Sequence, residues 1–221
     1  MSVDVNELAS RFSQLSGHPV LDLMNTVDWR LDGARAMDRL QKMDDVVDWC
    51  LLTGVLEQDE HSALGSLAGG HPRVADREHD AVIAWRELAY AAVVARSSQA
   101  MRQVVAEYRT VLERSDLRRV EPSGEWCWRD AHLDLATPRH RIVRATVDLA
   151  TRPDLGLIHQ CEDDACGWVY LDTSPRHNRR WCSAAGCGNR NRARRFTERR
   201  RTGADTAGNE TRPRRTTREQ A

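Results

Sequence analysis

The sequence predicts a mainly α protein, with an N-terminal helical domain over residues 1–153 and a small four-cysteine zinc module over residues 154–201. Three observations lead to this prediction. Apolar residues recur at helical spacing through most of the first 150 residues. Four of the six cysteines form two matched pairs after residue 160, and arginines are concentrated between and after these pairs. Residues 202–221 lack the larger aliphatic and aromatic residues, which predicts a disordered tail.

The length of 221 residues suits one domain or two small ones. Hydrophobic residues make up 40% of the chain and mean hydropathy is −0.63, which predicts a charge-rich globular protein. No apolar run approaches the roughly 18 to 20 residues needed to span a bilayer. Residues 1–16 lack the basic start and apolar stretch of a signal peptide. We therefore expect a cytoplasmic protein with no membrane partner.

The charges are balanced in total but not along the chain. The 33 basic and 33 acidic residues cancel, yet residues 1–150 hold 18 basic against 24 acidic side chains, and residues 151–221 hold 15 against 9. Lys42 is the only lysine, a bias that a GC-rich genome would explain equally well. Residues 174–201 contain ten arginines and one acid, Glu198. This density favours contact with a polyanion.

The N-terminal domain divides into several expected helices. Pro19 suits the first turn of a helix through residue 27, whose apolar residues would also fit a strand. Asp44 is a candidate N-cap for a helix that ends before Gly54. A short helix over 57–68 precedes the longest expected helix, which runs from about residue 76 to residue 112.

The helical period breaks between residues 121 and 135. Trp126 and Trp128 alternate there as they would in a short strand. Thr137 and Pro138 then have the residue types of an N-cap and a first helical position. We expect a helix from this point that ends before Pro153.

The paired cysteines predict one structural zinc ion. Their pattern is Cys-x4-Cys, fifteen residues, then Cys-x4-Cys, and each pair lies next to glycines that allow a tight turn. Four thiolates complete a tetrahedral shell and leave no open position for a substrate. The expected ligands are Cys161, Cys166, Cys182 and Cys187.

Two other uses of these cysteines remain open. Disulfides are not expected in a reducing compartment, and a redox pair normally has the closer Cys-x-x-Cys spacing. Cys50 and Cys127 are remote from either pair and are expected to be small buried residues. Trp168, Trp181 and Phe196 are the expected apolar filling of the zinc module, which is too small for a large core of its own.

An arginine-rich helix is expected from about Asn189 to residue 201. Ala193 and Phe196 would face the zinc module, so that most arginines point outward. Arginine forks suit phosphate oxygens and the acceptor edge of guanine. A solvated charged helix without a partner is the alternative. The candidate DNA-binding residues are Arg176, Arg179, Arg180, Arg190, Arg192, Arg194, Arg195 and Arg199.

Five polar residues interrupt apolar segments of the helical domain and form a candidate pocket for a small-molecule effector. The alternative, which we favour, is that they cap helices and hydrogen-bond internally. The five are Asp22, Asn25, Thr26, Arg30 and Arg86.

The favoured function is a regulator that binds double-stranded DNA through the arginine helix, with the helical domain sensing a ligand or forming a homodimer. The alternative is an RNA- or protein-interaction zinc module in which Trp168 or Trp181 stacks on bases. An enzyme is not expected, because no nucleophile elbow, phosphate loop or His-Glu metal motif is present.

The residues resemble a known family at two places. The run Cys187-Gly188-Asn189-Arg190, together with Arg179-Arg180-Trp181-Cys182-Ser183, resembles the CGNR zinc finger. Residues 21–27, Leu-Asp-Leu-Met-Asn-Thr-Val, resemble the start of the helical ABATE domain that usually precedes this finger. The resemblance implies a bacterial, stress-linked transcription regulator whose finger binds DNA. A lysine often found after the motif is absent here, and arginines keep the charge.

Overall fold

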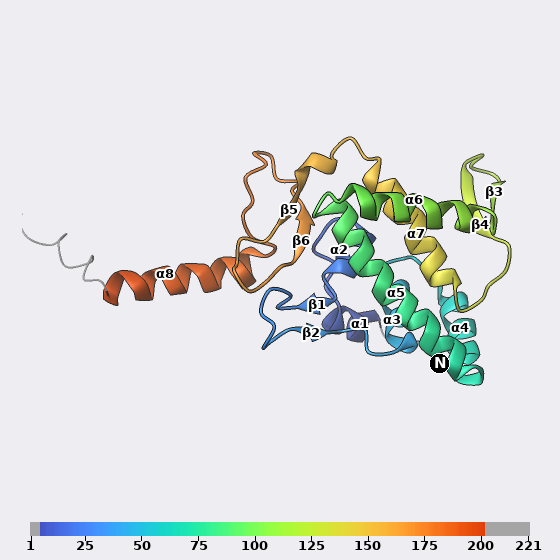
Figure 1. Cartoon of the computed structure of the whole chain (residues 1–221), viewed down its shortest axis with the longest axis horizontal. Helices are drawn as coiled ribbons and strands as arrows, with labels where there is room; N and C mark the ends of the chain where they lie inside the picture. The colour runs from blue at the N-terminus through green and yellow to red at the C-terminus, as the bar shows by residue number, and fades with distance from the viewer. Residues whose placement is uncertain (1–4, 202–221) are drawn as a thin grey trace, which may run out of the picture.

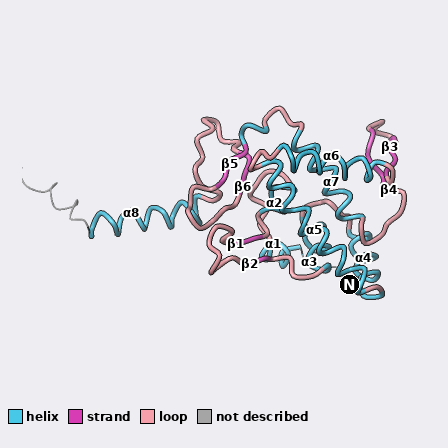
Figure 2. The backbone as a smooth tube through the Cα atoms, in the orientation of Figure 1, coloured by secondary structure: helices cyan, strands magenta, loops and turns pink. Residues whose placement is uncertain are grey.

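The computed structural model describes residues 5–201 and confirms a mainly α chain (Figure 1). The expected tail over 202–221 lies outside the described residues. Three antiparallel two-stranded sheets accompany the helices, and a one-turn π-helix precedes the last helix (Figure 2). In chain order the elements are α1 Val5–Arg11, α2 Pro19–Met24, β1 Val27–Asp28, β2 Met37–Asp38, α3 Met43–Leu52, α4 Gln58–Gly70, α5 Pro72–Val93, α6 Ser98–Leu112, β3 Ser115–Arg119, β4 Trp126–Asp130, α7 Thr137–Ala150, the 3-10 helix η1 Leu155–Leu157, β5 Ile158–Gln160, β6 Val169–Leu171, the π-helix η2 Ala184–Gly188 and α8 Asn189–Arg201.

The main core lies between α3, α4, α5, α6 and α7. Each helix contributes apolar residues at spacings of three and four, and burying that face supplies most of the stability of such a helix. Fully buried members from five different helices are Trp49, Leu64, Val82, Val104 and Ile142.

A second apolar cluster joins the helical domain to the zinc module. Val20, Leu21 and Met24 of α2 pack in this cluster with Val169 and Leu171 of β6. Residues of α5 and α7 complete the cluster, so it draws on elements from both parts of the chain. The zinc module therefore shares its apolar core with the helical domain.

Hydrogen bonds between β6 and the residues on either side of α2 fix the register of this contact. The Asn25 side-chain amide donates to the Val169 carbonyl at 2.8 Å, and its oxygen accepts from the Val169 N–H, also at 2.8 Å. The Leu171 N–H donates to the Ser16 carbonyl at 2.8 Å. The helical domain thus pairs with the backbone of β6 as a neighbouring strand would.

The single long helix expected from residue 76 to 112 is wrong, because the chain forms two helices there. α5 ends at Val93, and Arg96 adopts a left-handed conformation with φ of +53°. Ser97 then caps α6, and its hydroxyl accepts a hydrogen bond from the Ala100 N–H at 3.2 Å. A serine that can satisfy the backbone locally ends one helix and begins the next.

Two other helix starts also differ from the expectation. α3 begins at Met43 with Lys42 as its N-cap, and Asp45, not Asp44, accepts hydrogen bonds from the N–H groups before the helix. Thr137 is the first residue of α7, and its hydroxyl accepts from the Asp134 N–H at 2.9 Å. The capping groups act at these starts from within the first turn.

The strand expected around Trp126 and Trp128 is confirmed as β4. Its partner β3, which follows directly after α6, was missed because its charged residues lack the composition of a strand. None of the helices in the described part of the chain combines the length and apolarity that crossing a membrane would require.

The contact between α2 and β6 predicts a large effect of replacing Asn25. Leucine at this position keeps the volume but leaves the N–H and C=O of Val169 buried without partners, which should lower the free energy of unfolding by about 2–4 kcal/mol. Denaturant unfolding of the zinc-loaded protein measures this change. Gln103→Leu, at an exposed position on α6, serves as the control. A loss below about 0.5 kcal/mol would contradict the role given to Asn25.

Candidate metal centre and basic helix

The four cysteine thiols of the zinc module converge on one point. Cys161 follows β5, Cys166 ends the first turn, Cys182 precedes the π-helix η2, and Cys187 lies within η2. All four Sγ atoms lie within 4.8 Å of one another and all four residues are buried. Cys166 and Cys182 are 3.7 Å apart at sulfur, and Cys182 and Cys187 are 3.4 Å apart. Zinc bound tetrahedrally by thiolates at about 2.3 Å needs sulfur atoms about 3.8 Å apart.

The geometry therefore fits one structural zinc ion held by Cys161, Cys166, Cys182 and Cys187. These four residues fill a tetrahedral shell, so the metal would have no open position for water or substrate. All six cysteines are free of disulfides. Cys50 is fully buried in the main core, and burial raises the pKa of its thiol well above the usual range, as expected of an inert cysteine. Cys127 is only half-buried on β4.

The two cysteine turns are built by local side-chain contacts. The Asp163 carboxylate accepts from the Ala165 N–H at 3.2 Å, and the Cys166 N–H donates to the Asp163 carbonyl at 2.9 Å. In the second turn the Ser183 hydroxyl accepts from the Gly186 N–H at 3.1 Å. Gly167 has φ of +71°, and a Cβ there would meet Arg30 at 2.9 Å. Only glycine permits this close approach of the first turn to the helical domain.

The first turn is also bonded directly to the β1–β2 loop. The Arg30 N–H donates to the Cys166 carbonyl at 3.0 Å, and the Leu31 N–H donates to the Ala165 carbonyl at 3.3 Å. The Trp168 indole N–H donates to the Val27 carbonyl at 3.0 Å. A backbone segment of the helical domain thereby fixes the carbonyl groups beside a metal ligand.

Arg190 connects the metal centre to the helical domain. Its guanidinium donates to the Cys187 Sγ at 2.8 Å and lies 4.5 Å from the centre of the Trp29 ring. Arg35 lies 4.3 Å from the same ring centre. Trp29 itself has φ of +53°, an unusual conformation for a bulky residue. A charged donor to a ligating thiolate stabilises that thiolate, so Arg190 supports metal binding.

α8 leaves the module directly after the second cysteine turn and extends away from the rest of the molecule (Figure 1). The expectation that Phe196 faces the zinc module is wrong, because this side chain is 59% exposed. Asn191 is the buried residue instead, and its amide donates to the Asp163 carboxylate at 2.9 Å and to the Cys187 carbonyl at 3.1 Å. Phe196 lies on the side of α8 away from Asn191, so it has no core to enter.

The candidate DNA-binding arginines fall into two groups. Arg179 is half-buried, lies 4.1 Å from the centre of the Tyr170 ring, and donates to the carbonyls of Trp181 and Cys182. Arg179 and Arg190 thus hold the cysteine turns. The other six candidates are exposed. Arg176 and Arg180 lie between β6 and η2, and the remaining four lie on α8: Arg192, Arg194, Arg195 and Arg199.

Exposed arginines of this set also have partners within the protein. Arg180 pairs with Glu162, and Arg194 lies 3.2 Å from the Asp164 carboxylate. Arg192 donates to the Ala184 carbonyl at 3.1 Å. Exposed ion pairs of this kind contribute little stability, so these side chains can exchange their partners at small cost.

The five polar residues of the candidate pocket bond mainly within the protein. Arg86 is buried and binds Asp38 through both terminal nitrogens, at 2.9 and 2.7 Å, and also donates to the Thr26 hydroxyl at 3.0 Å. Arg30 pairs with Glu87 at 2.6 Å and donates to the Met24 carbonyl. This network agrees with the alternative to a ligand pocket, in which these polar residues hydrogen-bond within the protein. Asn25 and Thr26 also reach the edge of a cavity of about 380 Å³.

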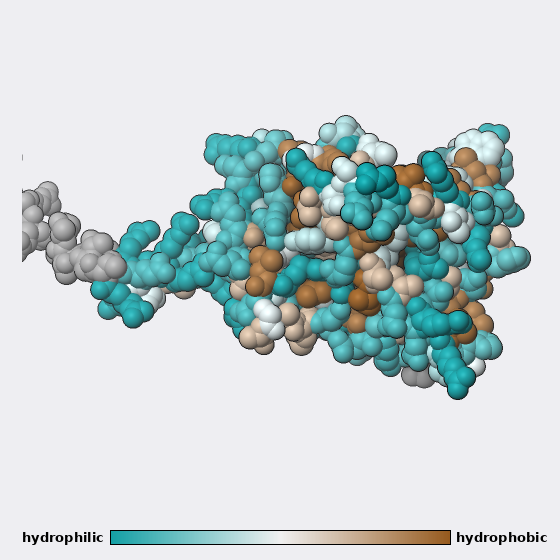
Figure 3. Space-filling view, viewed as in Figure 1, coloured by the Kyte–Doolittle hydropathy of each residue, from teal (hydrophilic) through white to brown (hydrophobic). Residues whose placement is uncertain are grey.

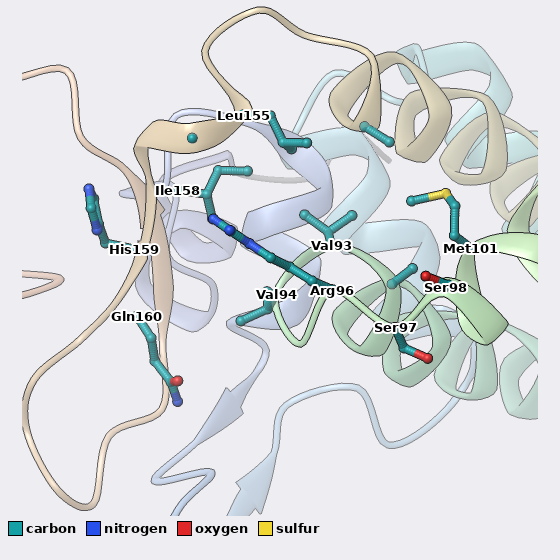
Figure 4. A pocket seen from close by; sticks show the side chains of 13 residues that line it. Val93, Val94, Arg96, Ser97, Ser98, Met101, Leu155, Ile158, His159 and Gln160 are labelled. Atoms are coloured by element: carbon teal, nitrogen blue, oxygen red, sulfur yellow. The ribbon is translucent and has the colours of Figure 1, made fainter.

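A larger cavity, of about 640 Å³, lies between the α5–α6 connection and β5 (Figure 4). Arg96 extends across it, and Val93, Met101 and Ile158 supply apolar walls. None of the five predicted pocket residues lines it. Sequence reasoning missed this cavity because it predicted a single helix over residues 76–112. That prediction left out the α5–α6 connection, whose residues line the cavity.

Taken together, a helical domain, a four-cysteine zinc module and an arginine-rich terminal helix define a zinc-finger protein of two joined parts. Comparison with family models gives the same division. Residues 158–200 match the CGNR zinc finger, and residues 17–153 match the ABATE family, described as "Putative stress-induced transcription regulator". The chain belongs to the ABATE family and carries a CGNR zinc finger, as its sequence resemblance indicated. No curated protein matches the chain.

The position of Arg190 predicts an effect on metal retention. Replacing Arg190 with Met keeps the contact with Trp29 but removes the donor to Cys187, and loss of such an outer partner typically weakens metal binding about tenfold or more. Arg195→Met, at an exposed position of the same helix, is the matched control. Competition with a chromophoric chelator measures zinc affinity. Equal affinities in the two variants would contradict the role of Arg190.

Asp22 predicts a pH dependence of stability. Its side chain is buried and accepts a hydrogen bond from the Ser16 N–H at 3.1 Å, and burial raises its pKa to about 6. A raised folded pKa means that the folded protein binds the extra proton, so this residue's contribution to stability is full below pH 4 and is lost as pH rises through 6.

Asp22→Asn removes this titration. The variant should gain stability relative to the natural protein as pH rises from 4 to 7, by up to about 3 kcal/mol. Denaturant unfolding of both proteins at each pH gives the difference between their free energies of unfolding. Zinc loss at low pH affects both proteins equally and cancels in this difference. A difference that does not change with pH would contradict the raised pKa.

Proposed function

We propose that this protein is a transcription regulator that binds double-stranded DNA through α8. The observation that supports the proposal is the shape of α8: a zinc-fixed first turn followed by an exposed helix with arginines at most positions. A free α-helix has the width of the major groove, and arginine binds both phosphates and guanine. The family description as a transcription regulator supports the same class of partner.

The arginines of α8 form two stripes. Arg190, Arg194 and Arg201 are spaced by four and seven residues and share one side of the helix. Arg192, Arg195 and Arg199 are spaced by three and four and share another side. A helix in a groove has a phosphate backbone on each flank, so two stripes suit it better than one. Asn189, Ala193, Phe196 and Arg200 lie between the stripes on the side away from Asn191.

The exposed Phe196 has a place in this arrangement. On the face between the stripes it would point at base edges, where apolar side chains contact the thymine methyl group. The four thiolates with one zinc ion carry a net charge of −2, which the arginines of α8 outweigh. The metal therefore supplies rigidity, and the arginines supply the attraction to DNA.

The helical domain determines where α8 points. Its β1–β2 loop and Trp29 contact the cysteine turns and Arg190, so a shift in this domain would move the first turn of α8. We propose that an effector binds the helical domain and works through this contact. The proposal assigns no catalysis to the protein, and its reduced thiols and DNA partner fit the cytoplasm.

Changing Arg192, Arg195 and Arg199 together to Ala should greatly weaken DNA binding while zinc content stays the same. Each lost phosphate contact lowers the slope of log affinity against log salt by about 0.9, so three contacts lower it by about 3. Fluorescence anisotropy with duplex DNA at several salt concentrations measures both quantities.

The matched control removes three exposed arginines from the helical domain: Arg73, Arg77 and Arg102. This variant has the same net charge as the α8 variant and should bind DNA with an unchanged slope. Equal losses in the two variants would refute specific use of α8. Tighter binding to single-stranded RNA than to duplex DNA would instead favour an RNA-binding module, because base stacking requires unpaired bases.

A further inference from the structure

The β3–β4 hairpin stands at the end of the molecule opposite to α8 (Figure 1). Its base is held firmly by α7, because the Asp130 carboxylate pairs with Arg141 at 2.7 Å and with Arg144 at 2.9 Å. Arg144 also donates to the Ser115 hydroxyl at 2.6 Å. The remainder of the hairpin extends beyond this base and is exposed on both strands. The hairpin therefore projects from the helical domain in a fixed orientation.

One face of the hairpin is apolar and exposed. Leu117 pairs with Trp128 across the two strands, so both side chains lie on one face, and Trp126 lies on the same face two residues away. Leu117 is 49% exposed, Trp128 40% and Trp126 65%. Two tryptophans and a leucine gathered on one projecting face are unusual for a surface and mark an interaction site. Apolar atoms are visible at this end of the space-filling view (Figure 3).

The backbone of β3 also has an open edge. The Val120 N–H donates to the Glu125 carbonyl at 2.7 Å, and the Ala131 N–H donates to the Arg114 carbonyl at 3.0 Å. Because hydrogen-bonding residues alternate along a strand, these two bonds turn the even-numbered residues of β3 toward β4. The N–H and C=O of Leu117 therefore point to the other edge, where no strand lies within residues 5–201.

The sequence of β3 is complementary to itself in an antiparallel pair. A two-fold axis beside Leu117 places this residue opposite Leu117 of a second copy, with both exchanging backbone hydrogen bonds. It also places Asp116 opposite Arg118 of the second copy, and Arg118 opposite Asp116. These charged residues form the non-hydrogen-bonded pairs, in which opposite side chains are closest.

We propose that β3 pairs with β3 of a second copy of this chain to form a four-stranded sheet in a homodimer. The sheet carries an uninterrupted apolar row of Trp128, Leu117 and the same two residues of the second copy. Pairing through β4 around Trp128 would instead oppose Cys127 to Arg129 and Trp126 to Asp130, with no matched charges. Charge complementarity and the open backbone edge both favour β3.

The dimer has a consequence for DNA binding that rests on the proposed function. Since the hairpin and α8 lie at opposite ends of the chain (Figure 1), pairing through β3 leaves the two α8 helices at the far ends of the assembly. Such a dimer would hold two separate DNA segments, whereas a dimer joined near α8 would read two adjacent half-sites.

Charge reversal tests the pairing directly. Asp116→Arg places two arginines opposite Arg118 residues, and Arg118→Asp places two aspartates opposite Asp116 residues, so each variant alone should dimerise about tenfold more weakly or worse. A mixture of the two variants restores both attractive pairs and should form heterodimers at least as well as the natural protein. The double variant should also dimerise. Analytical ultracentrifugation of the zinc-loaded protein without DNA measures each case.

The control is Asp80→Arg, which reverses an 83% exposed charge on α5 and should leave dimerisation unchanged. Circular dichroism verifies that each variant is folded. A natural protein that stays monomeric at all concentrations, or a mixture of single variants that fails to associate, would overturn the proposal. The measurement contains no DNA, so its failure leaves the proposed function of α8 untouched, and a failure of DNA binding leaves the dimer untouched.

Discussion

The structure depends on the contact between α2 and β6. The zinc module is too small to bury a core of its own, so Val169 and Leu171 complete an apolar cluster that α2, α5 and α7 begin. The Asn25 amide bonds to both backbone groups of Val169, and these bonds allow only one register. An apolar contact alone would permit sliding, whereas a bidentate hydrogen bond to one residue does not. The metal centre is thereby fixed to the helical domain.

This fixed contact extends to α8 through a short chain of side chains. Asp163 in the first cysteine turn accepts from Asn191 in the first turn of α8, and Arg190 links the Cys187 sulfur with the Trp29 ring. Zinc joins the two cysteine turns, so α8 has a defined starting direction. Arg190 and Asn191 hold the first turn of α8 in place, so the exposed arginines farther along the helix can contact a partner.

Several features could be predicted from the sequence because they depend on local chemistry. The cysteine spacing determined the metal and its ligands, since four thiols in two glycine-containing turns have few other geometries. The break of helical period around Pro122 and the Trp126 alternation indicated β4, and Gly188 followed by Asn189 indicated the start of α8. Phe196 was misjudged, because helical spacing gives a side chain a face but does not show whether another element lies opposite that face.

The sequence by itself determined the fold class, the zinc ligands and the basic character of α8, because each follows from residue types and their spacing over short distances. The tertiary structure decided which arginines serve the metal centre, that Asn25 pairs with a strand 144 residues away, and that Ser97 divides one helical pattern into two helices. These outcomes depend on which distant segments meet. Contacts of long sequence separation are set by the packing of the whole chain and leave no periodic signal in a single sequence.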